Sequence, residues 1–501
     1  MTMPSSTLTT LQRLSSGLPG LDQVLGGGFF QSGVYIVHGL PGSGKTILAN
    51  QLCYHQAAQG GRAVYVTLLA ESHSRMLQHI HTLSFFDESA IPDRVSYLSA
   101  FNVLEADGLK GLMTVLRQEM RSRAANVLVL DGLVAAAEAA PSDKELKKFI
   151  HELQTSAVFH GCTVFLLTSG TPQRISAEHT MVDGILELEE RLFDARSERS
   201  IQVRKFRGAA SLRGKHPLRI TDGGLVVYPR IETLFSAPPD PAVTSGALST
   251  GVKSLDRLID AGGLPQGSAT VVVGSTGTGK TTLGLHFLAG CSAQEPGLLF
   301  GFFESPGRLR AKASLLGLDV KGLEASGALT LMWSSQGEHV MDELGHRLLD
   351  AVQAKGVKRV VIDGLSGFFE SAVHPERITR YFSCLANELR RRGATVMMTL
   401  ETRDVVSSSV PLPYGVSGFV DNLLFLRFVE DSGIVKRLLT ITKMRDTHFY
   451  LGLHAFDIGA KGMRIADLHT ANGDVIPTAS AVSDGPSTQD TGNPPSADQQ
   501  R

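Results

Sequence analysis

Cysteine is scarce in this sequence. Among 501 residues there are four cysteines, Cys53, Cys162, Cys291 and Cys384, and they lie far apart along the chain. None of them has the paired spacing of a metal site or of a redox motif. A secreted scaffold built on disulfides is thereby excluded. The four thiols are expected to be inert side chains in a reducing compartment.

An excess of charge of either sign is also missing. The chain has 48 Lys and Arg residues against 49 Asp and Glu residues, which gives a formal net charge of −1. Proteins that bind nucleic acid or anionic membranes usually carry a basic surplus, so the composition disfavours both kinds of partner. The short basic cluster Arg390–Arg392 is interpreted as the solvated end of a helix.

Long apolar runs are missing as well. No uncharged apolar stretch is long enough to cross a bilayer, and the first residues lack the apolar core of a signal peptide. Hydrophobic residues nevertheless make up 42% of the chain, which is ample for buried cores. The sequence therefore predicts a soluble, cytoplasmic protein.

One glycine-rich motif occurs twice. "GLPGSGKT" begins at Gly39 and "GSTGTGKT" begins at Gly274. Each copy follows a β-like run and precedes a helical pattern, which is the context in which this loop binds phosphate. Loop N–H groups and the helix N-terminus would surround the phosphate oxygens, so ATP is the expected ligand. The loop residues expected at the nucleotide are Gly39, Gly42, Ser43, Gly44, Lys45 and Thr46 in the first copy, and Gly274, Thr276, Gly277, Thr278, Gly279, Lys280, Thr281 and Thr282 in the second.

Further motifs recur at nearly the same distance. Lys45 and Lys280 are 235 residues apart, and the basic motifs "KFRG" and "KMRD" are 238 apart. Two apolar runs ending in aspartate, "VLVLD" and "VVID", are 232 apart. A register that drifts so little indicates a tandem duplication with two complete nucleotide sites.

The duplication sets the domain limits. The sequence predicts a first domain over 1–234, a linker over 235–246, a second domain over 247–467 and a disordered tail over 468–501. Uniformly apolar runs alternate with helical patterns, which indicates strands covered on both faces. The expected fold class is α/β, with two tandem P-loop domains, each a mostly parallel sheet flanked by helices.

The chemistry of ATP hydrolysis assigns roles to several residues. Lys45 and Lys280 would reach the terminal phosphates. Catalysis also needs a metal and an oriented water. The residues expected to hold Mg²⁺ are Thr46, Asp131, Thr281 and Asp363, and those expected to orient the water are Glu71 and Glu304. A lone acid at a strand end is usually a surface carboxylate, but recurrence in both copies favours function.

The basic motifs place Lys and Arg two residues apart on extended segments, so both side chains point to one side. Lys205 and Arg207 form the first pair, and Lys443 and Arg445 form the second. Most such pairs are solvated strand faces. In ring-forming ATPases, late basic residues act on the neighbouring subunit's nucleotide, which makes a ring the expected assembly.

These motifs together resemble the KaiC family of tandem RecA-type ATPases, over roughly residues 10–467. The resemblance implies a double-ring homohexamer with ATP between subunits, slow ATPase activity in the first ring, and Ser/Thr autokinase activity with dephosphorylation in the second. It also implies which residues would meet a neighbour's ATP: Lys205, Arg207, Thr221 and Asp222 in the first ring, and Lys443, Met444, Arg445 and Thr447 in the second.

The chain departs from the family pattern at three places. Two adjacent glutamates are usual after the loop helix, whereas here Ala70 precedes Glu71 and Phe303 precedes Glu304. Clock members carry adjacent Ser and Thr phosphoacceptors, whereas here Ser417 is followed by a glycine. The tail has no resemblance to the partner-binding tail of the clock proteins.

The sequence predicts a KaiC-like ATPase that binds and slowly hydrolyses ATP at the subunit interfaces of a ring. It would serve signalling or regulation through an unidentified protein partner. Autophosphorylation of Ser417 is a further hypothesis, against the alternative that Ser417 is a turn serine. Two other functions stay open: a non-catalytic nucleotide-gated scaffold and, less favoured, a RecA-like DNA-handling ATPase.

Overall fold

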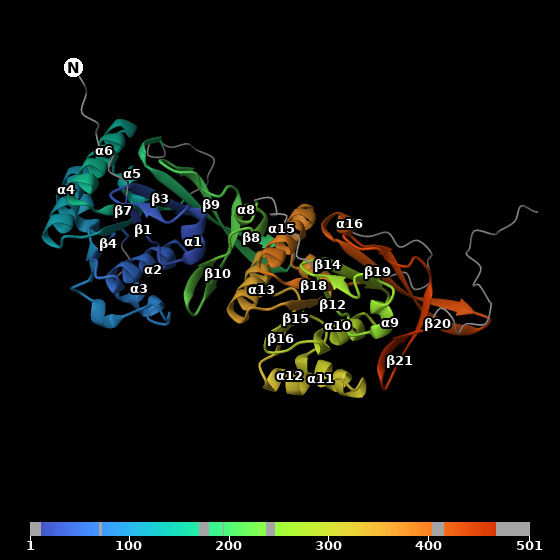
Figure 1. Ribbon diagram of the computed structural model, residues 1–501. Coiled ribbons are helices and arrows are strands. Elements are labelled where there is room, and N and C mark those ends of the chain that lie inside the picture. The colour runs from blue at the N-terminus through green and yellow to red at the C-terminus, as the bar shows by residue number, and fades with distance from the viewer. Residues whose placement is uncertain are drawn as a thin grey trace, which may run out of the picture.

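The computed structural model describes residues 12–69, 73–169, 180–193, 195–236, 246–402 and 415–466. The described chain forms two α/β halves that lie side by side (Figure 1). Each half contains a nine-stranded sheet, and the strands follow the same order in both sheets. The two halves therefore repeat one fold, as the recurring motifs predict.

The first sheet has a parallel part and an antiparallel part. In spatial order its strands are β11 (Gly224–Val227), β10 (Lys215–Thr221), β9 (Arg196–Phe206), β8 (Gly184–Phe193), β3 (Val34–Gly39), β7 (Thr163–Thr168), β6 (Val127–Asp131), β4 (Ala63–Thr67) and β5 (Val95–Ser99). The strands from β8 to β5 are parallel, and the other three continue the sheet in antiparallel fashion. The apolar strands β3 and β4 are buried along their whole length, because helices cover both faces.

The helices of the first half form a layer on each face of the sheet. They are α1 (Pro19–Val24), α2 (Lys45–Ala58), α3 (His73–Ile80), the 3-10 turn η1 (Glu88–Ala90), α4 (Phe101–Ser122, interrupted at Gly108), α5 (Leu133–Glu138), α6 (Asp143–His160) and α8 (Ile231–Leu234). Buried residues of α1, α2 and α3 share one hydrophobic cluster, and those of α4, α5 and α6 share another. A short strand pair, β1 (Arg13–Leu14) and β2 (Phe29–Phe30), precedes the sheet.

The second sheet repeats this arrangement strand by strand. Its order is β16 (Leu329–Trp333), β15 (Gly297–Gly301), β17 (Arg359–Asp363), β18 (Thr395–Glu401), β14 (Ala269–Gly274), β19 (Asn422–Asp431), β20 (Ile434–Lys443), β21 (His454–Gly459) and β22 (Gly462–Ile465). Here too the strands from β16 to β19 are parallel, and β20, β21 and β22 are antiparallel. The predicted fold class is confirmed for both halves.

The helices of the second half also cover both faces. They are α9 (Lys253–Asp256), α10 (Lys280–Ala289), α11 (Pro306–Leu315), α12 (Val320–Ala325), α13 (Met341–Lys355), α14 (Leu365–Glu370), the 3-10 turn η2 (Pro375–Arg377), α15 (Ile378–Arg391) and α16 (Val416–Phe419). The pair β12 (Ala247–Leu248) and β13 (Leu264–Pro265) corresponds to β1 and β2. Helices α9 to α12 pack on one face of the sheet, and α13, α14 and α15 pack on the other.

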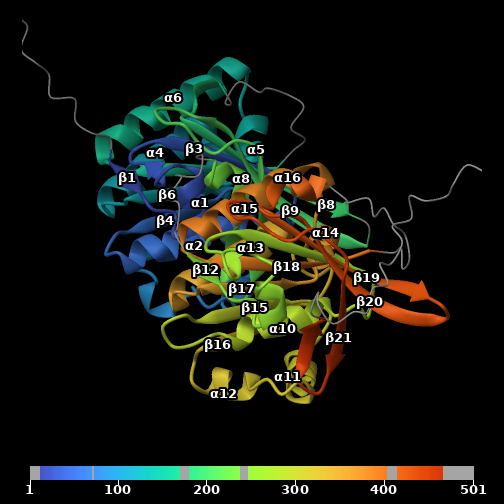
Figure 2. The same cartoon turned by 45° about the vertical axis from the view of Figure 1, so that its right-hand side comes forward.

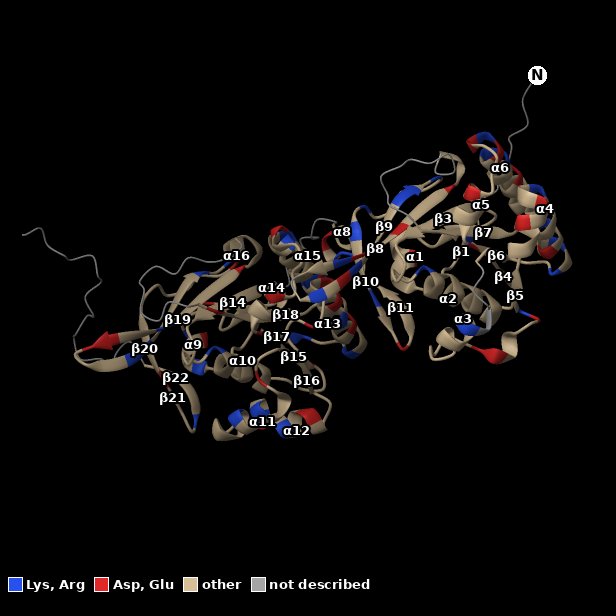
Figure 3. Cartoon of the chain, turned by 180° about the vertical axis from the view of Figure 1, so that it is seen from behind, with Lys and Arg blue, Asp and Glu red and all other residues tan. Residues whose placement is uncertain are grey.

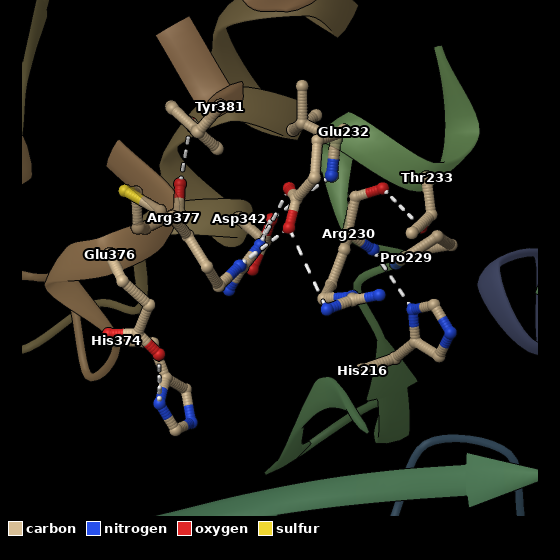
Figure 4. A network of polar contacts seen from close by, with 12 residues as sticks. His216, Pro229, Arg230, Glu232, Thr233, Asp342, His374, Glu376, Arg377 and Tyr381 are labelled. Carbon is tan, nitrogen blue, oxygen red and sulfur yellow. Dashed lines mark hydrogen bonds and ion pairs between the residues drawn. The ribbon is translucent and has the colours of Figure 1, made fainter. Parts of the chain in front are cut away.

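The two halves are joined by buried polar and apolar contacts. Helix α8 ends the first half, yet Ile231 belongs to the hydrophobic core of the second. The Arg377 guanidinium donates to both carboxylate oxygens of Glu232, at 2.7 and 2.9 Å, and to Asp342 at 2.8 Å. The Ile231 N–H also donates to Asp342 (Figure 4). The last turn of the first half is therefore anchored in the second.

The surface shows two further features. The hairpin β19–β20 projects from the second half (Figure 2). Basic and acidic segments alternate over α4, α6, α11 and α12 (Figure 3), which agrees with the balanced composition. Across the described ranges, no helix combines the length and apolarity needed to span a membrane.

Candidate functional site

The first glycine-rich loop connects the end of β3 to the start of α2. Its glycines Gly42 and Gly44 have φ values of +83° and +103°, which side-chain-bearing residues rarely adopt. Gly44 is the N-cap of α2 and no side chain caps this helix. The N–H groups of the first turn are therefore left to a ligand, and the helix dipole favours an anion there.

The second loop has the same construction between β14 and α10. Gly277 and Gly279 have φ values of +81° and +108°, and Gly279 is the uncapped N-terminus of α10. A Cβ atom on Gly274 would lie 2.3 Å from the Leu426 carbonyl oxygen, so the loop fits tightly against β19. Thr278 closes the loop from inside, since its hydroxyl donates to the Ser275 carbonyl at 2.8 Å.

Both loop lysines fold back over their own loop. Lys45 Nζ donates to the carbonyls of Gly39 and Leu40, at 2.7 and 3.0 Å. Lys280 Nζ donates to the carbonyls of Gly274 and Ser275, at 2.7 and 2.8 Å. Burial lowers the pKa of both lysines, and the neighbouring acids oppose that shift. Each ammonium is thus held at the loop mouth, where a phosphate oxygen is a stronger partner than a carbonyl.

The loops also contain polar atoms that suit a phosphate ligand. The hydroxyls of Ser43 and Ser275 are buried and have no hydrogen-bond partner within the described ranges. A buried hydroxyl without a partner is costly, and phosphate oxygens would satisfy it. In the second loop, Thr276 is exposed and Thr282, in the first turn of α10, is buried. The residues present therefore fit the phosphates of a nucleotide.

The residues predicted to hold Mg²⁺ contact each other directly in the second site. Thr281 Oγ1 lies 3.2 and 3.1 Å from the two carboxylate oxygens of Asp363, which ends β17. Thr399 on β18 donates to Asp363 Oδ1 at 2.7 Å. Burial raises the pKa of Asp363, and both threonine hydrogen bonds oppose that shift. Hydroxyl and carboxylate oxygens are hard ligands of the kind Mg²⁺ prefers, so this pair fits the ion.

The first site brings the corresponding residues together through a tyrosine. Tyr65 on β4 donates its phenol hydrogen to Asp131 Oδ2 at 2.5 Å. The Thr46 side chain acts on the same phenol and opposes, more weakly than burial, the rise of its pKa. Burial, with the Asp131 carboxylate beside it, raises the pKa of Tyr65 well above its usual range, so the phenol stays protonated. Thr46 and Asp131 would hold Mg²⁺ here.

The two acids predicted to orient the attacking water are Glu71 and Glu304. Glu71 lies outside the described residues. Glu304 follows β15 and forms an ion pair with Lys312 on α11. The Glu304 carboxylate contributes to the raised pKa of Asp363, which places it close to the metal-holding group. Phe303 beside it is 54% exposed.

The basic pairs occupy equivalent places at the ends of β9 and β20. Lys205 Nζ donates to the Thr180 carbonyl at 3.0 Å, and the Arg207 guanidinium donates to the carbonyls of Thr180 and Met181. The second pair makes related contacts. Lys443 Nζ donates to the carbonyls of Ser417 and Val420, at 2.7 and 2.6 Å, and Arg445 lies 3.4 Å from Asp421. For both lysines the pKa is lowered, first by burial and then by the adjacent arginine.

The other residues implied by the resemblance make contacts within their own half of the chain. Thr221 and Asp222 form the β10–β11 turn, which packs on α2 of the same chain, since Gln51 Oε1 accepts from the Leu225 N–H. Met444 packs partly buried against the second core, and Thr447 Oγ1 accepts from the Ala261 N–H. Their meeting with a neighbour's nucleotide stays a prediction.

Ser417 is exposed on the short helix α16. Its carbonyl accepts from Lys443, so the candidate phosphoacceptor shares a surface with the second basic pair. Gly418 follows it and is exposed as well. The Tyr414 end of this segment lies outside the described residues.

Four side chains at the sites were not predicted from the sequence. Tyr65, Thr399 and Lys312 contact the predicted acids, and Glu401 accepts a 2.5 Å hydrogen bond from Thr276 in the second loop. Glu401 ends β18, and its charge opposes the lowering of the Lys280 pKa. The position of an acid at a strand end, used for Asp363, would have found Glu401.

Comparison with known proteins agrees with this geometry. A family model described as "ATPase: KaiC" matches the chain twice, over residues 14–232 and 248–470. The circadian clock oscillator protein KaiC of a Picosynechococcus species is 25% identical over 490 residues, covering 93% of each chain. The circadian clock protein KaiC3 of a Synechocystis species is 25% identical and covers 91% of this chain and 92% of its own. The chain belongs to the KaiC ATPase family.

Proposed function

We propose that the protein binds Mg·ATP at both glycine-rich loops and hydrolyses it slowly at the subunit interfaces of a homohexameric ring. The observation that carries the proposal is the repeated constellation of a lysine held over its loop, a loop threonine and a strand-end aspartate. Recurrence of these residues in both halves supports the same Mg·ATP chemistry at both loops, and release of phosphate would distinguish hydrolysis from binding alone.

The residues of the chain divide the chemistry between them. The loop N–H groups and Lys45 or Lys280 bind and orient the phosphates, while Thr46 with Asp131 and Thr281 with Asp363 hold the ion that neutralises their charge. Glu304 orients the attacking water in the second site. A neighbour's Lys443 and Arg445 would stabilise charge on the transferred group. One glutamate where relatives have two fits a slow reaction.

A second activity, autophosphorylation of Ser417, rests on its exposure beside Lys443. If Lys443 reaches a neighbour's γ-phosphate, the Ser417 hydroxyl would face the same group. Transfer would form a bond between Ser417 Oγ and the γ-phosphorus, break the bond to the β–γ bridging oxygen, release ADP, and move the hydroxyl proton to a base such as Glu304.

One experiment addresses both activities. Purified protein is incubated with γ-labelled Mg·ATP, and released phosphate, bound nucleotide and label on the protein are followed together. Lys45→Ala and Lys280→Ala each remove one charge from the phosphates, so each variant should lose one of two bound nucleotides per chain. Lys144→Ala, an exposed lysine of α6, is the matched control and should bind as the unaltered protein does.

The outcomes separate the functions. If ATP is bound but no phosphate is released, the protein is a nucleotide-gated scaffold and not an ATPase. If Lys280→Ala binds as many nucleotides per chain as the unaltered protein, the second loop has a purely structural role. Phosphate release without label on the segment around Ser417, located by phosphopeptide mass spectrometry, would leave an ATPase without autokinase activity there. A salt-dependent mobility shift with DNA would favour the RecA-like DNA-handling alternative.

A further inference from the structure

The two sites hold their metal-binding aspartates in opposite ways. Asp131 and Asp363 end equivalent strands in the two sheets, each between two neighbouring strands. In the first half Asp131 accepts a hydrogen bond from Tyr65 on β4. In the second half Asp363 contacts Thr281 of the loop and also accepts a hydrogen bond from Thr399 on β18, the strand on the other side.

The strand register identifies the residues that occupy equivalent positions beside the two aspartates. Tyr65 pairs with Val129, two residues before Asp131, so both side chains lie on the same face of the sheet. The residue equivalent to Tyr65 in the second half is Leu299, which pairs with Val361, two residues before Asp363. Leucine offers no hydrogen bond, and Leu299 is fully buried in the apolar core.

On the strand at the other side of each aspartate, β7 in the first half and β18 in the second, it is the first half that has the leucine and the second half that has the hydroxyl residue. Asp131 pairs directly with Leu167 of β7, whose buried side chain belongs to the first core. The β17–β18 register pairs Ile362 with Met398, so Thr399 stands at the place equivalent to Leu167. On the two strands beside each aspartate, one position thus has a hydroxyl residue and the other has a leucine. The hydroxyl residue is on β4 in the first half, and it is on β18, the equivalent of β7, in the second half.

The donors are themselves fixed. Thr399 Oγ1 accepts from the Gly364 N–H at 2.8 Å, so its single proton is directed to Asp363. Thr399 is only 2% exposed, so its hydroxyl is shielded from solvent. Tyr65 is fully buried, and its ring is held by the first core. A carboxylate that accepts from a fixed donor cannot rotate freely, which directs its other oxygen toward the ion.

We infer that Tyr65 and Thr399 are positioning residues that fix the metal-holding carboxylates Asp131 and Asp363, each in its own site. The inference rests on the proposed function, because it presumes that these aspartates hold Mg²⁺. Partners of this kind typically change metal affinity about 10- to 100-fold when removed. Loss of either hydroxyl should therefore raise the Mg²⁺ requirement of one site and leave the other unchanged.

The test measures binding of a fluorescent ATP analogue as Mg²⁺ is titrated. Tyr65→Phe is examined in the Lys280→Ala background, which leaves the first site, and Thr399→Val in the Lys45→Ala background, which leaves the second. The Mg²⁺ concentration at half-maximal binding should rise about 10- to 100-fold in each variant. Analogue affinity in EDTA should stay unchanged, because the phosphate loop is untouched.

Two controls separate positioning from packing. Tyr97→Phe removes another phenol of the first half, a partly buried one that donates to Asn50 at 2.8 Å, and should keep the original Mg²⁺ requirement. Thr399→Ser keeps the hydroxyl and should restore most of it in the second site. An equal rise in Tyr97→Phe, or no difference between Thr399→Val and Thr399→Ser, would overturn the inference.

The two proposals fail in distinguishable ways. If the background proteins bind the analogue with a Mg²⁺ requirement that Tyr65→Phe and Thr399→Val do not change, only the inference is overturned. If the background proteins show no response to Mg²⁺, the proposed metal-dependent function is overturned and the inference with it. A lowered requirement in Tyr65→Phe would mean that the phenol competes with the ion, which also contradicts the inference.

Discussion

Glu304, the acid that follows β15, is the residue proposed to orient the attacking water in the second site. Glu304 pairs with Lys312, but the two side chains are 26% and 36% exposed. Ion pairs at such positions contribute on the order of 0.2–1 kcal/mol, because water screens them and both chains lose freedom. The contact therefore does not lock the carboxylate, and Glu304 can turn toward an attacking water when nucleotide is bound.

Replacing Glu304 with Gln should lower phosphate release by the second site roughly 10²-fold, since an amide cannot accept the proton of the attacking water. The rate is measured in the Lys45→Ala background so that the first site does not contribute. Lys312→Met is the matched control, and about a twofold change at most is expected from the weak ion pair. Equal losses in both variants would mean that the ion pair, and not the acid, supports the site.

At the scale of elements, the sheets and loops could be predicted because their patterns are local. Apolar runs such as "VLVLD" become buried parallel strands, and the glycine spacing specifies a loop between a strand and a helix. Tyr65 and Thr399 could not be predicted in this way. A tyrosine or threonine within a strand is ordinary, and only the pairing of β4 with β6 and of β17 with β18 brings each one to its aspartate.

Helix α8 was also beyond prediction, since its four residues carry no periodic pattern. Ile231 is fully buried in the core of the second half, and a Cβ on Gly345 of α13 would lie 3.2 Å from its Cγ1 atom. The Ile231 N–H donates to Asp342, and in the polar network of Figure 4 Glu232 and Asp342 share Arg377. The end of the first half is thus a structural part of the second.

Ile231→Ala should consequently destabilise the second half by about 3 kcal/mol, the usual cost of truncating a buried isoleucine. Trp333 is the only tryptophan of the chain and lies on β16 of the second half, so its fluorescence reports unfolding of that half in urea. Ile36→Ala truncates an equally buried residue of the first core and should leave the Trp333 midpoint in place. A Trp333 midpoint that shifts only in Ile36→Ala would contradict the assignment of α8.

At the scale of the whole molecule, both halves present a basic pair at the equivalent strand end. The lysines of both pairs donate to backbone carbonyls, which are weaker partners for an ammonium group than a phosphate is. Arg445 is 57% exposed and lies 3.4 Å from Asp421. Such cations suit a phosphate contributed by another subunit, where an arginine commonly accelerates transfer about 10³- to 10⁵-fold. Assembly and catalysis would then depend on the same side chains.

A non-hydrolysable ATP analogue with Mg²⁺ should therefore convert the protein from smaller species to a closed hexamer, as measured by light scattering at micromolar protein. Arg445→Ala should weaken this conversion and leave the nucleotide-free species unchanged, because the arginine acts only when a neighbour's phosphate is present. Arg464→Ala, an exposed arginine on β22, should assemble like the unaltered protein. A mass that stays monomeric at saturating nucleotide would exclude the ring, and full assembly of Arg445→Ala would show that this arginine does not reach a neighbouring site.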